Sequence, residues 1–402
     1  MIDMKTVCVV NQCAGCMACV DICPKNAIKI EDSMEYYNAV IDESKCVGCN
    51  ACLRVCQQMC HHVLLSPLKW FQGWANNLDV RLKGASGGVA YAIERQFIKD
   101  GGIVLSCTFD EGMFKFGCAD TEQELIRFVG SKYVKSNPAG IYKLMIRHLN
   151  AGKKVLFVGL PCQVAAARNY MKDSDINNFY SIDLICHGTP SPGILECYLK
   201  QYGLSLKSVD SLKFRTKTRF QILSGYNPVE GEIGICDHYS TAFLNCVCYT
   251  ENCYACNYAK KERISDITLG DSWGTKLESK QVEKGISLVL CQTRKGEDLL
   301  RNSDLYLMEL DEKGIANAIA NNHQLQQPSQ KPTFRERFFD EMKDEKKFNT
   351  IVRHYYPWIC FKQLIKKMLI KIGLIHQGGD FLGRIRGGGG KYQISVKYRK
   401  DE

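Results

Sequence analysis

The sequence predicts a multidomain protein of mixed α+β and α/β class. Three observations lead to this prediction. The chain has 402 residues, enough for roughly two to four domains. It carries 22 Cys, packed most densely into an N-terminal segment that repeats itself. Strand-like and helix-like apolar segments then alternate through the middle of the chain, which is typical of an α/β body.

The N-terminal segment, residues 1–65, is expected to form a separate small domain. Four Cys at fixed spacing recur with an offset of 33 residues: Cys13, Cys16, Cys19 and Cys23 match Cys46, Cys49, Cys52 and Cys56. Between the two runs, Ala27–Ile30 and Ala39–Ile41 are predicted to form short strands.

The spacing of each run, C-x2-C-x2-C-x3-C, is typical of an iron–sulfur site. Three Cys in a tight loop hold one cluster, and the fourth holds the other cluster of a two-cluster ferredoxin. We therefore expect a two-cluster ferredoxin fold with two 4Fe–4S clusters. Paired structural zinc sites are the alternative, although zinc ligands normally come in separated pairs. The ligand sets are Cys13, Cys16, Cys19 and Cys56, and Cys46, Cys49, Cys52 and Cys23.

The remaining Cys near this module, Cys8 and Cys60, lie outside the repeat and are interpreted as packing residues. The chain start, MIDMKTVCVV, does not read as a signal peptide. The sequence also lacks the stretch of about 20 apolar residues that a membrane-spanning helix needs. We therefore expect a cytoplasmic protein whose thiolates serve as metal ligands or redox centres.

The body, from about residue 70 to 325, shows the alternation of helices and strands. Val89–Ile98, Ile141–Leu149 and Val164–Met171 have helical apolar spacing. The predicted strands are Gly101–Cys107, Lys153–Val158 and Tyr180–Cys186.

Five phrases of the body are unusual for a generic fold. They are Gly84–Val89 (GASGGV), Gly130–Val134 (GSKYV), Gly159–Val164 (GLPCQV), Asp183–Gly188 (DLICHG) and Asp266–Asp271 (DITLGD). In this order they resemble the coenzyme F420 hydrogenase/dehydrogenase beta-subunit family. The resemblance spans about residues 75–275, and the ferredoxin module is fused in front of this region. It implies an N-terminal-like domain at 70–150, a C-terminal-like flavin and iron–sulfur domain at 151–330, and leaves 331–402 as a basic helical tail.

The resemblance also implies an activity. Family members are iron–sulfur flavoproteins, so we expect FAD and an oxidoreductase that passes electrons from ferredoxin or another redox partner through the clusters to FAD. The final acceptor would be a small organic molecule, F420-like or another, and some bacterial relatives are associated with surface-polysaccharide synthesis. The alternatives are a non-catalytic electron-transfer subunit that feeds a partner enzyme, and a zinc-stabilised binding protein.

The candidate flavin-binding residues lie in these phrases or, for Ser136, two residues after one of them. Small residues before a predicted helix allow backbone amides to approach a phosphate, although a serine cap with a tight turn would look the same. The loop after residue 130 offers hydroxyl and ammonium donors for a pyrophosphate or ribose, as an ordinary solvated loop also would. The full set is Ser86, Gly87, Gly88, Ser131, Lys132, Ser136, Gln163 and Asp271.

A third 4Fe–4S cluster is expected from a second group of Cys. Cys248, Cys253 and Cys256 follow the pattern C-x4-C-x2-C, and Cys162 is expected to complete the set. Cys162 is expected to open a helix after a strand, a position that lowers the pKa of a thiol. Cys186 and Cys246 compete for a place in the set, and a zinc knot is the alternative.

His187 is a candidate proton donor during substrate reduction, because the ordinary histidine pKa lies near operating pH. A hydrogen-bonded structural histidine after a strand is the alternative interpretation.

The net charge of +10 is concentrated at the C-terminus, where residues 331–402 hold 17 Lys and Arg against 8 Asp and Glu. Ile359–Leu374 has apolar residues on one helical face and lysines opposite. Two arrangements fit this pattern: peripheral contact with an anionic membrane surface, or a helix docked on the body with a lysine-rich solvent face. No basic patch interleaved with aromatic residues suggests nucleic-acid binding.

Overall fold

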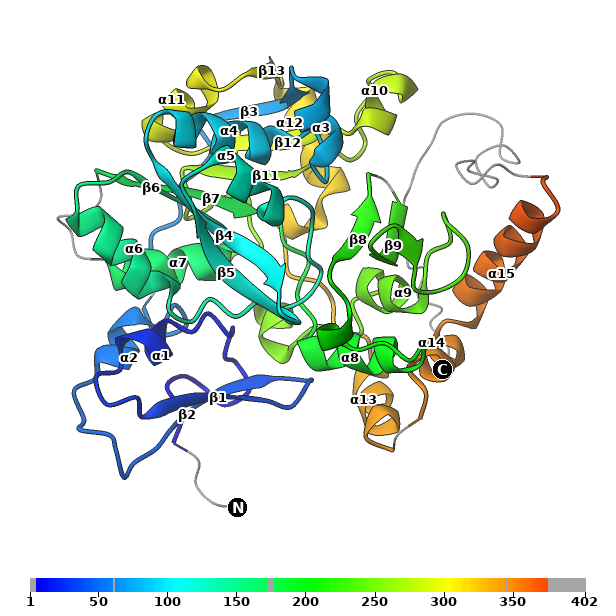
Figure 1. Ribbon diagram of the computed structural model, residues 1–402, viewed down its shortest axis with the longest axis horizontal. Helices are drawn as coiled ribbons and strands as arrows, with labels where there is room; N and C mark the ends of the chain where they lie inside the picture. The colour runs from blue at the N-terminus through cyan, green and yellow to red at the C-terminus, as the bar shows by residue number, and fades with distance from the viewer. Residues whose placement is uncertain (1–4, 61, 172–176, 218, 345, 375–402) are drawn as a thin grey trace.

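The computed structural model describes residues 5–60, 62–171, 177–217, 219–344 and 346–374 (Figure 1). These residues form an N-terminal module, a body built on an eight-stranded sheet, and a lobe of helices and a small sheet. Much of the tail expected at 331–402, including its glycine run Gly387–Gly390, lies outside the described residues.

The N-terminal module has the same local geometry in both halves, as its sequence repeat predicts. Each half places a glycine and a second residue in the left-handed region directly before a short helix. The φ angles are 69° at Gly15 and 61° at Met17 in the first half, and 68° at Gly48 and 55° at Asn50 in the second. These residues turn the cysteine loops tightly. The elements are α1 (Ala18–Ile22), α2 (Ala51–Val55), and the antiparallel β1 (Ile28–Asp32) and β2 (Tyr37–Ile41).

The body holds the first cysteine loop and helix α1 through hydrogen bonds between side chains and backbone groups. The Tyr142 hydroxyl donates to the Cys16 carbonyl at 2.6 Å, and the Lys135 ammonium donates to the Ala14 carbonyl at 3.0 Å. The Gly140 amide donates to the Asp21 carboxylate at 2.7 Å. The loop is thus fixed against the body and not only against its own module.

The body is organised by one mixed sheet with the strand order β13-β3-β12-β11-β7-β6-β4-β5. The four strands β11, β7, β6 and β4 run parallel, so their carboxyl ends meet at one edge, the usual place for a site in an α/β sheet. Strands from both ranges expected as separate domains, 70–150 and 151–330, join this sheet. Its strands are β3 (Lys69–Ala75), β4 (Ile103–Asp110), β5 (Met113–Ala119), β6 (Val155–Gly159), β7 (Phe179–Leu184), β11 (Ile267–Asp271), β12 (Ser287–Cys291) and β13 (Leu305–Glu309).

Alternate residues of the central strands feed two cores, because successive strand side chains point to opposite faces. Leu105 and Phe157 pack with α6, α7 and the N-terminal module on one face. Val104 and Leu156 pack with α4, α5 and α11 on the other. The helices of the body are α3 (Leu78–Lys83), α4 (Val89–Lys99), α5 (Glu122–Leu125), α6 (Ile141–Asn150), α7 (Pro161–Tyr170), α10 (Ser279–Lys284), α11 (Arg294–Asn302) and α12 (Glu312–Asn321).

Every strand and helix predicted in the alternating segment is present, with ends that differ by a few residues. Helix α7 begins at Pro161 and not at Val164, because proline suits the first turn of a helix, where no backbone donor is needed. Strand β4 begins at Ile103, after Gly101 turns the chain with a φ of 78°.

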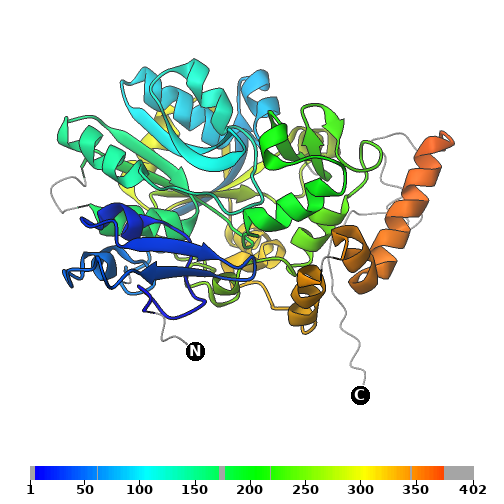
Figure 2. The same ribbon diagram turned by 60° about the horizontal axis from the view of Figure 1, so that its bottom comes forward.

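The third part is a lobe with its own buried core, in which aromatic side chains such as Phe214, Tyr239 and Phe348 pack together. Its strands are β8 (Leu212–Thr216), β9 (Arg219–Ser224) and β10 (Asn227–Pro228). Its helices are α8 (Pro192–Lys200), α9 (His238–Leu244), α13 (Arg335–Lys343) and α14 (Phe348–Tyr355). Helix α15 (Pro357–Lys371) follows and lies at the edge of the molecule (Figures 1 and 2).

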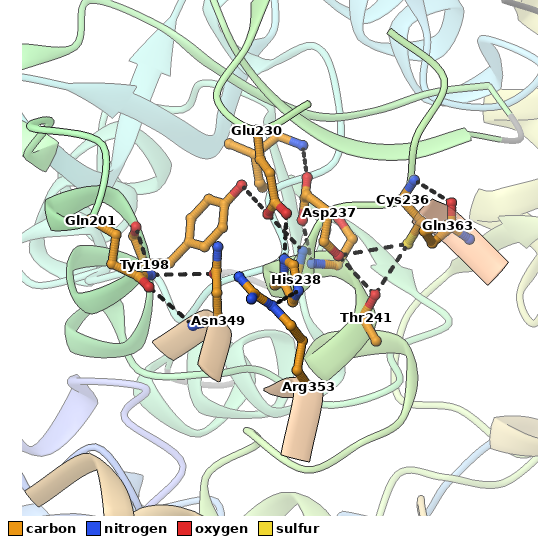
Figure 3. Close-up of polar contacts among 12 residues, drawn as sticks. Tyr198, Gln201, Glu230, Cys236, Asp237, His238, Thr241, Asn349, Arg353 and Gln363 are labelled. Atoms are coloured by element: carbon orange, nitrogen blue, oxygen red, sulfur yellow. Dashed lines mark hydrogen bonds and ion pairs between the residues drawn. The ribbon is translucent and has the colours of Figure 1, made fainter. Parts of the chain in front are cut away.

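Polar contacts fasten the last helices to α9 (Figure 3). Asp237 caps α9 by accepting a hydrogen bond from the Ser240 amide at 2.6 Å. Arg353 of α14 donates to the His238 ring at 3.3 Å, and Gln363 of α15 accepts from the Cys236 amide at 3.1 Å. The side of α15 that carries Gln363 is therefore the side that contacts the lobe. No helix within the described ranges is long and apolar enough to cross a membrane.

Candidate functional site

The first cysteine set gathers in the interior, as the crossover pattern predicts. Cys13, Cys16, Cys19 and Cys56 are all buried in one core. Burial is the largest cause that raises the pKa of Cys19, and the neighbouring Cys13 and Cys56 thiols raise it further. Cys56, from the second repeat, thus lies among the cysteines of the first.

The second cysteine set lies toward the surface. Cys46 and Cys49 are exposed and Cys52 is half-buried. Burial raises the pKa of Cys52, and the nearby Cys46 and Cys49 thiols add to the effect. The sulfur of Cys23 accepts a hydrogen bond from the Ala27 amide at 3.3 Å, which matches the bond from the Gly15 amide to the Cys13 sulfur at 3.4 Å. Amides that point at sulfur are typical of iron–sulfur sites.

Cys8, interpreted from the sequence as a packing residue, lies beside two of the candidate ligands. Hydrogen bonding to the Cys13 and Cys56 thiols is the largest cause that raises its pKa. Its position could not be read from the repeat, since Cys8 has no counterpart at the repeat offset. Cys60, in contrast, donates to the Leu53 carbonyl at 3.6 Å inside its own turn.

A third group of cysteines lines one pocket between the N-terminal module and the body. Cys162 follows β6, Cys186 follows β7, and both therefore lie at the carboxyl edge of the parallel strands. Cys253 and Cys256 come from the segment that follows α9. The pocket has about 600 Å³ of empty space, part of it open to solvent, and Ala14 of the first cysteine loop borders it.

The structure places Cys248 elsewhere, so it differs from the ligand set expected from sequence. Cys248 is fully buried in the core of the lobe, and Cys246 packs against that same core. Neither residue lines the pocket. The run Val247–Thr250 packs entirely inside the lobe, and the chain reaches the pocket at Asn252 and Cys253. Cys186 takes the fourth place in the pocket.

Two buried cations flank the pocket. Burial raises the pKa of Cys162, and the charge of Lys135 opposes that rise and also acts on Cys13. Arg263 lines the pocket and acts in the same direction on Cys256. The Thr189 amide donates to the Cys253 sulfur at 3.4 Å. These are the contacts that stabilise thiolates bound to a metal cluster.

The pKa expectation for Cys162 is wrong for the protein without metal. Cys162 does open α7 after β6, as predicted, but burial outweighs the helix terminus and Lys135 and raises the pKa of the thiol. A buried thiol of this kind becomes a thiolate when a metal replaces its proton. Burial of this kind does not favour a free reactive thiol.

A second constellation lies at the same edge of the sheet and is centred on Arg215 of β8. Its guanidinium forms a bidentate pair with Asp271 at 2.6 and 2.8 Å. It also donates to the Tyr133 hydroxyl and to the Ala85 carbonyl, each at 3.1 Å. Arg215 thus joins three of the five phrases singled out in the sequence. Its buried Nε has no hydrogen-bond partner among the described residues, so one donor is left over.

The glycine loop expected to hold a phosphate is packed against the protein itself. The Ser86 hydroxyl donates to the Ile286 carbonyl at 2.7 Å, and the Gly87 amide donates to the Ser287 hydroxyl at 3.0 Å. A Cβ at Gly87 would lie 2.5 Å from the Gly73 carbonyl oxygen. Gly88 caps α4 with a φ of 79°. The small residues are therefore explained by close backbone packing.

The other residues expected to contact a flavin also form interactions within the protein. The Lys132 ammonium donates to the Phe128 carbonyl at 2.7 Å. The Gln163 amide donates to the Ser136 hydroxyl at 2.9 Å, beside the cysteine pocket. The Ser131 hydroxyl lies close enough to the Tyr133 phenol to lower its pKa, although burial dominates and raises it. Of the expected set, Asp271 and Ser131 lie at the Arg215 constellation.

His187 lies between the two constellations. It lines the cysteine pocket, its ring lies edge-on to that of His323 with centroids 5.6 Å apart, and the charges of Asp271 and Arg215 act on its pKa. Burial lowers the pKa of His187 to about 4, and His323 lowers it further. The Gln324 amide lies 2.7 Å from its Nδ1. The expectation of a pKa near operating pH is therefore wrong, and a neutral, hydrogen-bonded imidazole is what the surroundings favour.

The zinc alternative requires ligands that converge on one point, since zinc binds thiolates at about 2.3 Å. Within the described ranges, no three His, Cys, Asp or Glu side chains are arranged to hold a single metal ion. Cys162, Cys186, Cys253 and Cys256 line the pocket.

Two known families match this chain, one in the body and one in the N-terminal module. Residues 152–312 match the family described as the C terminus of the coenzyme F420 hydrogenase/dehydrogenase beta subunit. Residues 12–60 match the 4Fe-4S dicluster domain. These matches confirm the resemblance seen in the sequence phrases, although the phrases at 84–89 and 130–134 lie outside the matched range. A search of curated proteins gives no match.

Among solved structures, a chain of the F420-reducing [NiFe] hydrogenase complex from Methanosarcina barkeri, studied by xenon derivatization, is similar to this chain. The identity is 18% and the TM-score 0.46, over 67% of this chain and 97% of that chain.

Proposed function

Because residues 152–312 match the family described as the C terminus of the coenzyme F420 hydrogenase/dehydrogenase beta subunit, and residues 12–60 match a 4Fe–4S dicluster domain, we propose that the chain conducts electrons between the dicluster domain and a third cluster in the body. The two domains together indicate an iron–sulfur electron-transfer protein related to the F420 hydrogenase beta subunit. The third cluster and the direction of electron flow are the proposal.

The observation that supports this proposal is the position of the four-cysteine pocket. It is bordered by Ala14 and Gln57, each next to a candidate ligand of the first cluster. Tyr258 lines the pocket as well, and the Cys162, Cys256, Cys16 and Cys56 thiols all act on its pKa, which burial raises most. Tyr258 is thus a shared neighbour of the pocket and of the first cysteine set.

The exposure of the cysteines suggests the order in which electrons pass through the three cysteine sets. Cys46 and Cys49 are exposed, so the second set is accessible to a protein donor such as a ferredoxin. Cys13, Cys16 and Cys19 are buried between that set and the pocket. We propose that electrons enter at the second set, pass the first set and reach the pocket.

The direct test is the metal content of protein purified without oxygen. We expect about twelve irons and about twelve sulfides per chain, since each cluster contributes four of each. About eight of each would restrict the clusters to the dicluster domain and overturn the third site. Zinc in place of iron would overturn the proposal altogether.

Lys135 is expected to set the reduction potential of the clusters around it. A positive charge at a distance of several ångströms in a protein interior favours the reduced, more negative cluster. Lys135→Gln should therefore lower the potential of the affected clusters by roughly 50–100 mV. A redox titration followed by electron paramagnetic resonance would measure it. The exposed Lys143→Gln on α6 is the control, and equal shifts in both variants would contradict the role of Lys135.

The finer part of the proposal concerns a flavin and its acceptor. FAD, when bound, would convert single electrons from clusters into hydride transfer to an organic acceptor of the deazaflavin class or another. The constellation around Arg215 is where we propose that it binds, because the unpartnered, buried Nε of Arg215 is a donor that a cofactor would satisfy. A link to surface-polysaccharide synthesis stays a prediction.

Flavin binding is tested by extracting flavin from protein reconstituted with FAD. We expect about one FAD per chain, and Arg215→Gln should lose most of it while keeping its iron. Lys213→Gln, which changes an exposed cation of the same strand, is the matched control and should bind FAD normally. Retained iron shows that Arg215→Gln is folded. Full FAD binding by that variant would contradict the proposed place.

The engagement of Ser86, Gly87, Lys132 and Ser136 within the protein favours a second candidate, a subunit without a flavin that passes electrons to a partner enzyme. This candidate predicts iron without flavin. It also predicts turnover of an acceptor only when a partner protein is added.

A further inference from the structure

Helix α15 exposes its apolar side to solvent. Trp358 is 73% exposed, Phe361 50%, Met368 55% and Ile372 66%. At helical spacing these four side chains, together with Leu364 and Ile365, occupy one side of the helix. None of the residues of α15 is fully buried. A surface helix of a globular protein normally turns such a side toward the core.

The opposite side of α15 contacts the lobe through polar groups. Gln363 accepts from the Cys236 amide at 3.1 Å, and the Lys366 ammonium donates to the Gly234 carbonyl at 2.8 Å. Ile359 and Ile370, on the same side, are half-buried. One arrangement expected from the sequence, a docked helix with a lysine-rich solvent face, is therefore wrong, because the contacts to Cys236 and Gly234 hold the helix the other way round.

The charges around the apolar side are all positive. Lys362 and Lys371 are exposed on either border of it, and the sequence has no Asp or Glu between Lys347 and Asp380. This side of α15 is an apolar strip that is bordered by lysines and has a tryptophan in its first turn. Such a strip fits an anionic lipid surface, whose layers differ in polarity and charge. Apolar side chains enter the acyl boundary, tryptophan prefers the headgroup level, and lysines reach the lipid phosphates.

We propose that α15 docks the protein on an anionic membrane surface, lying in the interface with Trp358, Phe361, Met368 and Ile372 inserted. A second copy of the chain fits the same side less well, because two such faces would bring their Lys362 and Lys371 rows together. At 15 residues the helix lies on a bilayer and does not cross it.

The place of α15 in the molecule is compatible with this orientation. The N-terminal module lies at one end of the molecule and α15 at the other, in both views (Figures 1 and 2). Docking through α15 would therefore leave the exposed Cys46 and Cys49 region open to the solution.

The test is co-sedimentation of the full chain, purified with its clusters, with vesicles. Phosphatidylcholine vesicles are compared with vesicles that contain roughly one third phosphatidylglycerol. We expect sedimentation with the anionic vesicles, weakened by high salt because exposed charges are screened. Replacing the two central apolar residues, F361S/M368S, should weaken binding at least tenfold. K362Q/K371Q should weaken binding to anionic vesicles roughly tenfold.

The matched control is M113S/I126S, which changes two apolar residues of similar exposure, 50% and 51%, on the sheet side of the molecule. It should bind like the parent. No sedimentation of the full chain would overturn the proposal, and so would binding that F361S/M368S retains, since the residues beyond 374 would then be responsible. A concentration-dependent dimer that F361S/M368S abolishes, without vesicle binding, would assign the face to a second copy instead.

Discussion

Replacing Cys186 or Cys253 by serine is expected to remove about four of roughly twelve irons from the protein, whereas Cys248→Ser should remove none. Cys186 and Cys253 line the pocket between the dicluster domain and the body. Cys248 belongs to the same stretch of sequence as Cys253, yet it is fully buried in the core of the lobe. The three substitutions exchange the same sulfur for the same oxygen, so they differ only in position.

Iron and sulfide analysis of the three variants, purified side by side without oxygen, measures the effect. The spectrum of the remaining clusters shows whether Cys186→Ser still holds those of the dicluster domain. Serine is a poor ligand for iron, but it fits the volume of cysteine, and this keeps the comparison free of large cavities. Iron loss from Cys248→Ser together with full iron in Cys186→Ser would restore the ligand set that the sequence spacing suggested.

The contrast between the two cysteine groups shows where spacing is informative. The N-terminal ligands lie in tight loops, so their spacing along the chain fixes their spacing in space. The third group draws on residues after β6, after β7 and after α9, and only the sheet brings these together. Cys253 and Cys256 were predicted from their local pattern. Choosing between Cys186 and Cys248 required knowing that β6 and β7 are parallel neighbours.

The same limit applies to the Arg215 constellation. The phrases that contain Ala85, Tyr133 and Asp271 stood out in the sequence, and they do meet in space. The residue that joins them did not stand out, since Arg215 lies in a β8 segment with several other basic residues. What distinguishes it is burial, at 5% exposure of its side chain, because a buried guanidinium must find acceptors. Alternation along the strand would have placed Arg215 on the face of the exposed Lys213, and the register shift between these two residues breaks that pattern.

The positions of the helices and strands were predictable because the spacing of apolar residues and the positions of glycine and proline can be read directly from the sequence. The direction of an amphipathic helix was not. The pattern of Ile359–Leu374 gives an apolar and a basic side, but which side faces the protein depends on what the lobe offers. Here the lobe offers the Cys236 amide and the Gly234 carbonyl, which bind polar side chains.

A second large effect is expected from Asp183→Ala, which should lower the free energy of unfolding by about 3–5 kcal/mol. Asp183 and Arg263 form an ion pair at 3.2 Å with side-chain exposures of 0% and 1%. Arg263 also donates to the Leu184 carbonyl at 2.8 Å and to the Tyr258 carbonyl. Removing the carboxylate leaves a buried guanidinium without its counter-charge beside the cysteine pocket. The midpoint of urea unfolding, followed without oxygen, measures the loss.

Two further variants separate the charge from the volume. Replacing both partners, D183A/R263M, should recover most of the stability, because burying an unpaired charge costs far more than removing a pair. Arg294→Ala breaks an ion pair to Glu297 whose arginine is 85% exposed, and it should cost less than about 1 kcal/mol. An Asp183→Ala protein as stable as Arg294→Ala would show that solvent reaches Arg263. The wall of the pocket would then be open, and a cluster bound there would not be shielded from water.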